Sequence, residues 1–78
     1  MITISFENKG NTGLAEWIYT SIKNQILNGK LKANEKLPSK RTLSEHLGVS
    51  VITVQNAYFQ LISEGYIYSI EKKRILRN

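Results

Sequence analysis

The segment from Leu37 to Gly65 limits the possible folds more than any other part of the chain. Ser39 and Ser50 are each placed to cap a helix, because a serine hydroxyl accepts a hydrogen bond from a free N–H group in the first turn. Gly48 stands where a left-handed residue ends a helix. We therefore predict two helices here, the second over residues 50–64 and ending before Gly65.

Two short helices joined by a turn that contains glycine form the helix-turn-helix pattern, whose second helix enters the major groove of DNA. The apolar spacing places Val54, Tyr58 and Leu61 on the buried side of the second helix. Ile52 and Phe59 then lie on the exposed side, where bulky apolar groups require an explanation. Ile52 is near enough to the helix start to meet a thymine methyl group. For Phe59, further along the helix, we expect a contact with the N-terminal arm or with another subunit.

The rest of the chain predicts a helix before this motif and a β-hairpin after it. Residues 14–28 form an amphipathic pattern with Thr12 as a possible N-cap, and its apolar stripe comprises Leu14, Ile18, Ile22 and Ile26. Residues 66–70 and 74–77 favour strands, with a basic turn at residues 71–73. The predicted fold is therefore mainly α with a small β-hairpin: a winged helix-turn-helix of three helices plus a wing.

Residues 1–13 are expected to form an N-terminal arm ahead of a winged-helix domain over residues 14–78. Ile2, Ile4 and Phe6 alternate with polar residues, which indicates a short strand or an extended arm. The pattern leaves open whether this arm packs on the domain, packs on a second copy or is unpacked.

Composition narrows the classes of function. The chain has 78 residues with 11 Lys and Arg against 6 Asp and Glu, a net charge of +5 that mildly favours polyanionic partners. The absence of cysteine excludes disulfides and thiolate metal sites. No apolar run approaches the roughly 20 residues of a membrane span. Because no secretory signal is visible either, we predict a cytoplasmic protein that does not associate with membranes.

An enzyme is not expected. His46 is the single histidine, the six acidic residues show no metal-ligand or carboxylate-pair spacing, and no glycine-rich phosphate loop is present. We therefore predict no catalytic residue, no metal site and no cofactor.

Residues 15–69 resemble the DNA-binding head of the GntR family of bacterial transcription regulators. The resemblance is carried by the runs ILNGKL, LPSKR, LGVS, TV, AY and L-x-x-x-G-Y, the last two being most similar to YtrA-type or MocR-type regulators. It implies a winged-helix head that binds operator DNA as a homodimer. In the family a C-terminal domain usually senses a small molecule, and in the MocR-type branch it is similar to a pyridoxal-phosphate aminotransferase. Nothing of that kind fits after Asn78, so we expect a short protein or a fragment, with an effector ligand only where such a domain exists.

The same resemblance places family DNA contacts on Arg41, Ser50, Thr53, Gln55 and a wing tip near residues 72–73. Two departures matter. Val51 stands where the family usually has arginine, and the wing tip reads Glu-Lys-Lys-Arg in place of glycines. Because arginine would pair with guanine, its loss leads us to expect an operator richer in A·T at this position.

DNA binding needs cations for phosphate and polar groups for base edges. Lys40, Arg41 and the wing residues supply cations, while Gln55 and Asn56 can pair bidentately with adenine. The candidate DNA-binding residues are Ser39, Lys40, Arg41, Ser50, Val51, Ile52, Thr53, Gln55, Asn56, Lys72, Lys73 and Arg74. For some of them a structural role is an open alternative: Ser50 as a cap, Thr53 as a neutral surface residue, Arg41 as a partner of Glu45 and Asn56 as a bystander.

We thus expect sequence-specific binding of double-stranded DNA, with the recognition helix in the major groove and the basic wing at residues 71–74 on the backbone or in the minor groove. The alternative is a winged-helix protein-interaction module that does not bind specific DNA, for which the exposed Ile52 and Phe59 would provide the contact surface.

Overall fold

Three helices and a small sheet surround one apolar core in a computed structural model that describes residues 2–70 and 74–78. The elements in chain order are α1 (Leu14–Leu27), β1 (Lys36–Leu37), α2 (Lys40–Leu47), α3 (Val51–Ser63), β2 (Ile67–Ile70) and β3 (Arg74–Arg77). This order confirms the predicted winged helix-turn-helix. The expected wing turn, with Lys72 and Lys73, lies outside the described residues.

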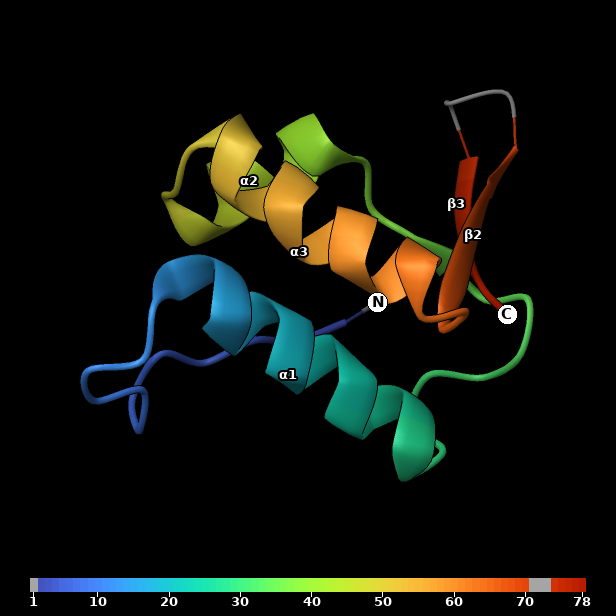
Figure 1. The fold of residues 1–78 in the computed structure, drawn as a ribbon, viewed down its shortest axis with the longest axis horizontal. Coiled ribbons are helices and arrows are strands. Elements are labelled where there is room, and N and C mark those ends of the chain that lie inside the picture. The colour runs from blue at the N-terminus through green and yellow to red at the C-terminus, as the bar shows by residue number, and fades with distance from the viewer. Residues whose placement is uncertain (1, 71–73) are drawn as a thin grey trace.

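The buried side of α3 packs against α1 and α2, as the apolar spacing predicted. Val54, Tyr58 and Leu61 are buried together with Ala57, and α1 contributes Ile18, Ile22 and Ile26 to the same core. Figure 1 shows α1 lying along one side of α3, while the starts of α2 and α3 and the β2–β3 hairpin reach the opposite edge of the molecule. This arrangement leaves one whole edge of the motif free of α1.

The sheet has three antiparallel strands in the order β1–β3–β2, so it contains one strand that the sequence did not predict. β1 is only two residues long, and its Lys36 and Leu37 pair with Leu76 and Ile75 of β3. Leu37 is buried in the core, which explains why this short segment is held against the hairpin.

The N-terminal arm is extended but pairs with no strand among the described residues. Instead, two side chains of α1 donate to its carbonyl groups: Trp17 Nε1 to Ser5 O at 2.8 Å and Gln25 Nε2 to Thr3 O at 2.8 Å. Ile2 is buried in the core of its own chain. The arm therefore packs along the helices.

Two details of α1 differ from the prediction. Gly13 occupies the N-cap position without a side-chain hydrogen bond, so Thr12 is not the cap. Leu14, expected in the buried stripe, is 41% exposed, and the buried stripe begins one turn later at Ile18. Leu27, at the other end of the helix, is 66% exposed. In the parts of the chain that the structure describes, no helix is both long and apolar enough to cross a bilayer.

Candidate nucleic-acid interface

Each helix of the helix-turn-helix begins with the same serine–threonine cap. Ser39 Oγ accepts from Thr42 N at 3.1 Å, and Ser50 Oγ accepts from Thr53 N at 3.1 Å. The hydroxyls of each pair are also hydrogen-bonded, at 2.9 Å for Ser39–Thr42 and 2.8 Å for Ser50–Thr53. Ser50 thus has its expected capping role. The caps fix where both helices begin, and each satisfies one N–H group of its first turn.

The turn between these helices follows the predicted geometry. Gly48 has φ 70°, in the left-handed region, and its N–H group donates to the carbonyl of Ser44. An L side chain is strained there, which is why glycine suits the position. The two capped starts consequently reach the same edge of the molecule (Figure 1).

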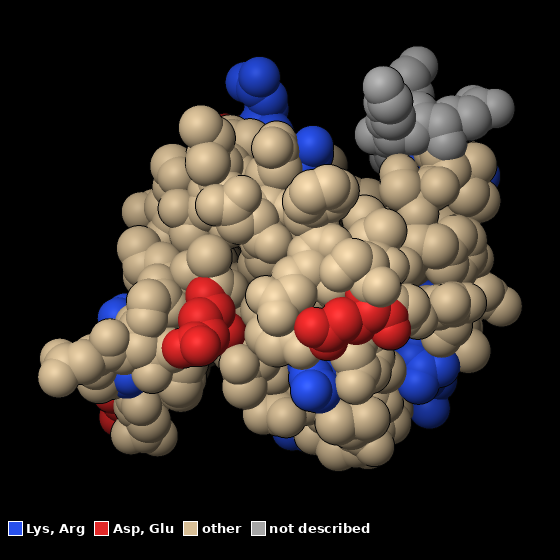
Figure 2. Space-filling view, viewed as in Figure 1, with Lys and Arg blue, Asp and Glu red and all other residues tan. Residues whose placement is uncertain are grey.

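Cationic side chains lie on this edge. Arg41 is exposed in the first turn of α2, and Arg74 is exposed where β3 begins. In Figure 2 lysine and arginine side chains project above α2, and others lie lower, near the acidic side chains over α1 and beside the end of α3. The cations above α2 have the charge that a polyanion favours.

The outer face of α3 combines apolar and amide groups. Ile52 is 67% exposed and Val51 is 40% exposed, and Gln55 and Asn56 are exposed beside them. Thr53 is only half-buried, and its hydroxyl is engaged with the Ser50 cap. Of the sequence-predicted residues on this helix, Val51, Ile52, Gln55 and Asn56 are consequently exposed, while Thr53 is held in the cap.

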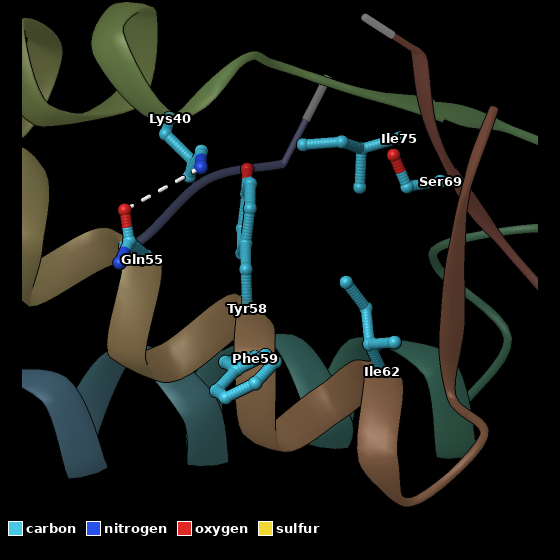
Figure 3. Close-up of a pocket in the computed structure, with 7 residues that line it drawn as sticks. All are labelled: Lys40, Gln55, Tyr58, Phe59, Ile62, Ser69 and Ile75. Carbon is cyan, nitrogen blue, oxygen red and sulfur yellow. Dashed lines mark hydrogen bonds between the residues drawn. The ribbon is translucent and has the colours of Figure 1, made fainter. Parts of the chain in front are cut away.

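A groove of about 370 Å³ lies between α3 and the sheet, and sequence reasoning did not predict it. It is lined by Lys40, Gln55, Tyr58, Phe59, Ile62, Ser69 and Ile75 (Figure 3). At one end of it, Lys40 Nζ donates to Gln55 Oε1 at 3.5 Å. Phe59 is 72% exposed and lines this groove, so it is not covered by the N-terminal arm. The one sequence signal for the groove was the bulky apolar residue on the outer face of α3.

His46 is an exposed residue near the end of α2. Within residues 2–70 and 74–78, no group of three histidine or acidic side chains is arranged to hold a metal ion.

Comparisons with known proteins agree with this geometry. Residues 14–76 match the family described as "Bacterial regulatory proteins, gntR family". The HTH-type transcriptional regulator YhdI of Bacillus subtilis is 42% identical over 71 residues, which are 91% of this chain but 15% of YhdI. The chain therefore spans less than a sixth of the length of that relative.

Two solved structures show the same fold. YtrA from Sulfolobus acidocaldarius, a GntR-family transcription factor, superposes with a TM-score of 0.83 at 35% identity, covering 99% of this chain and 80% of YtrA. The DNA-binding domain of AraR in complex with operator ORR3 gives a TM-score of 0.76 at 26% identity, over 83% of this chain and 78% of that one. Together with the family match over residues 14–76, these likenesses show that the chain belongs to the GntR family of bacterial regulatory proteins and has the winged-helix fold of its DNA-binding domains.

Proposed function

We propose that this chain binds double-stranded operator DNA sequence-specifically, as the DNA-binding part of a bacterial transcription regulator. In this proposal α3 lies in the major groove, and the wing at residues 71–74 contacts the backbone or the minor groove. We further propose that residues 14–78 act as the binding domain and residues 1–13 as an arm packed on it.

One observation carries the proposal: the starts of α2 and α3 and the hairpin share an edge that α1 leaves free (Figure 1). The side chains on this edge are the types that DNA requires. Arg41 and Lys40 are cations at the first turn of α2, and Gln55 and Asn56 are exposed amides on α3. The structural likeness to AraR, whose DNA-binding domain is solved with an operator, supports the same docking for this chain.

The proposed contacts divide by chemistry. Phosphate contacts come from the first turns at Ser39 and Ser50 and from cations, namely Arg41, Lys72, Lys73 and Arg74, whereas Lys40 lies against Gln55. Base contacts come from α3, where Gln55 and Asn56 offer hydrogen bonds and Val51 and Ile52 offer apolar contact to thymine methyl groups. Thr53 contributes through the Ser50 cap.

A fluorescence-anisotropy titration with labelled duplexes at two salt concentrations tests the proposal. Because each neutralised phosphate releases counterions, log K should fall with log salt with a slope near −0.9 for every phosphate contact. We expect a steep slope and a preferred site in a pool of random duplexes. Binding that is absent at low salt, or present without any preferred sequence, would contradict the proposed function.

A protein-interaction module is the second candidate, favoured by the 67% and 72% exposure of Ile52 and Phe59. Such a module would bind DNA weakly and with little salt dependence. The same titration separates the two candidates. If the chain is a protein-interaction module, Ile52→Ser should leave its weak association with DNA unchanged.

We also propose that the protein acts as a homodimer on DNA, with half-sites about one helical turn apart. Leu14 and Leu27 of α1 are exposed and offer apolar contact area for a second copy. Sedimentation velocity with and without a two-fold site tests this, and a strictly 1:1 complex would contradict it.

We further propose that the protein acts in the cytoplasm by binding rather than by catalysis, and without a cofactor. A small-molecule effector belongs to the proposal only for a protein in which a further C-terminal domain follows this one.

A further inference from the structure

Lys40 and Gln55 come from different helices but meet at one end of the groove (Figure 3). Lys40 Nζ donates to Gln55 Oε1 at 3.5 Å. An ammonium group has three donors and no acceptor, so it holds the amide oxygen toward itself and leaves the amide NH₂ group on the other side. The lysine thus sets the orientation of the glutamine side chain.

The backbone around this pair is fixed from both helices. The Tyr58 hydroxyl donates to the Pro38 carbonyl at 2.7 Å, two residues before Lys40. Ser39 caps α2 immediately ahead of Lys40 through its bond from Thr42 N. Tyr58 itself lies one turn after Gln55 on α3. The start of α2 is therefore tied to the turn of α3 that carries Gln55, which keeps the two side chains within reach of each other.

We propose that Lys40 and Gln55 act as one donor unit that recognises guanine in the major groove. This inference rests on the proposed function and names the base read by that site. Guanine presents two acceptors, N7 and O6, to the major groove, whereas adenine presents one acceptor and the N6 amino donor. The pair offers two amide N–H groups and the remaining ammonium N–H groups, while its amide oxygen is turned toward the ammonium group of Lys40.

The other bases match this unit less well. The amino group of adenine or cytosine would face a donor, which leaves both groups unpaired, and a buried unpaired group is costly. Thymine offers O4 as its single acceptor in the major groove. Gln55 with a free oxygen would instead form the bidentate pair with adenine that glutamine commonly makes. Lys40 is therefore the residue that decides between guanine and adenine at this base pair.

Selection of bound duplexes from a random pool, with the wild-type chain and four variants, tests the inference. Gln55→Ala identifies the base pair, because selection should relax at that position alone. Lys40→Met keeps the aliphatic stem and removes the donors, so the preference at the same position should change from guanine to adenine by about tenfold or more. Lys36→Met, on β1, removes the same charge and should leave the selected base unchanged. In Lys40→Met/Gln55→Ala the adenine preference should disappear, because Gln55 is its source.

The outcomes distinguish this inference from the proposed function. The inference is supported if the wild-type chain selects guanine at the base pair that Gln55→Ala identifies, and Lys40→Met selects adenine there. Selection of adenine by the wild-type chain, or a guanine preference that Lys40→Met retains, overturns the inference while the proposed function stands. A pool without any enriched sequence overturns both.

Discussion

The Tyr19 hydroxyl donates to Glu64 Oε1 at 2.5 Å and so joins the middle of α1 to the end of α3. Gln60 Nε2 donates to the other carboxylate oxygen at 3.2 Å. The Lys23 ammonium lies 5.6 Å from the centre of the Tyr19 ring and 5.5 Å from that of Tyr66. This cluster links α1 to the end of the helix proposed to read DNA, at the surface of the domain.

Acid should weaken this junction. The hydrogen bond from Tyr19, and secondarily that from Gln60, holds the pKa of Glu64 below its ordinary value of 4.5. A carboxyl whose pKa is lowered by folding stabilises the fold above the unfolded pKa, and this contribution is lost as the pH falls through the folded pKa. We therefore expect the Tm of wild-type protein to fall between about pH 6 and pH 3 more steeply than that of Glu64→Gln.

Thermal unfolding followed by circular dichroism across this pH range measures the difference in Tm. The difference should be small because Glu64 is exposed. Tyr19→Phe removes the larger of the two hydrogen bonds and keeps the one from Gln60, so the fall of its Tm with pH should lie between those of wild type and Glu64→Gln. If the Tm of all three proteins fell equally as the pH is lowered, the junction would make no contribution to stability.

Loss of the Tyr58 hydroxyl should destabilise the domain. Burial raises the pKa of Tyr58, so the group is a neutral donor, and its bond to Pro38 O is partly buried. Tyr58→Phe leaves that carbonyl without this donor. It should lower the free energy of unfolding, measured by urea denaturation, by about 1–2 kcal/mol. Tyr68→Phe is the matched control, because its exposed bond to Asn34 Oδ1 should contribute under about 0.5 kcal/mol. Equal losses in the two variants would contradict the assignment.

Removal of the Arg41 cation should weaken binding to all duplexes alike. If Arg41 contacts phosphate, Arg41→Ala should reduce the magnitude of the salt slope by about one unit and leave the selected sequence unchanged. Lys32→Ala, at an exposed position between α1 and β1, is the control for net charge. A change confined to one base pair, with the slope intact, would assign Arg41 to a base edge instead.

Val51 and Ile52 should favour A·T pairs where they face the DNA. Both are exposed at the start of α3, and their apolar side chains can contact the thymine methyl group but cannot pair with guanine. Ile52→Ala should lower the thymine preference at one position in selected duplexes without abolishing binding. A strict G·C requirement opposite residues 51–52 would contradict this prediction.

Local signals in the sequence were enough to predict the motif. Ser39, Ser50 and Gly48 define their helix ends through hydrogen bonds within a few residues, so their roles could be predicted without knowing the tertiary fold. The buried face of α3 followed from its apolar spacing in the same way. The family match over residues 14–76 confirms the resemblance that these signals supported.

The features that sequence reasoning missed depend on contacts between distant residues. β1 is two residues long, without periodicity, and exists through pairing with β3, about 40 positions later. The arm is held by Trp17 and Gln25, whose side chains reach back to its carbonyls. The Lys40–Gln55 contact required the packing of α2 on α3. Gln55 alone indicated recognition of adenine, whereas Gln55 beside Lys40 leads us to infer recognition of guanine.

The central position of β3 in the sheet has a consequence for DNA recognition. β3 is bonded to β2 on one side and to β1 on the other, and β1 ends at Leu37, directly ahead of the first turn of α2. We therefore expect a duplex that displaces the hairpin to displace the start of α2 as well. If the hairpin contacts the DNA backbone as proposed, a DNA site whose groove width suits the hairpin poorly should also present its bases poorly to Lys40 and Gln55.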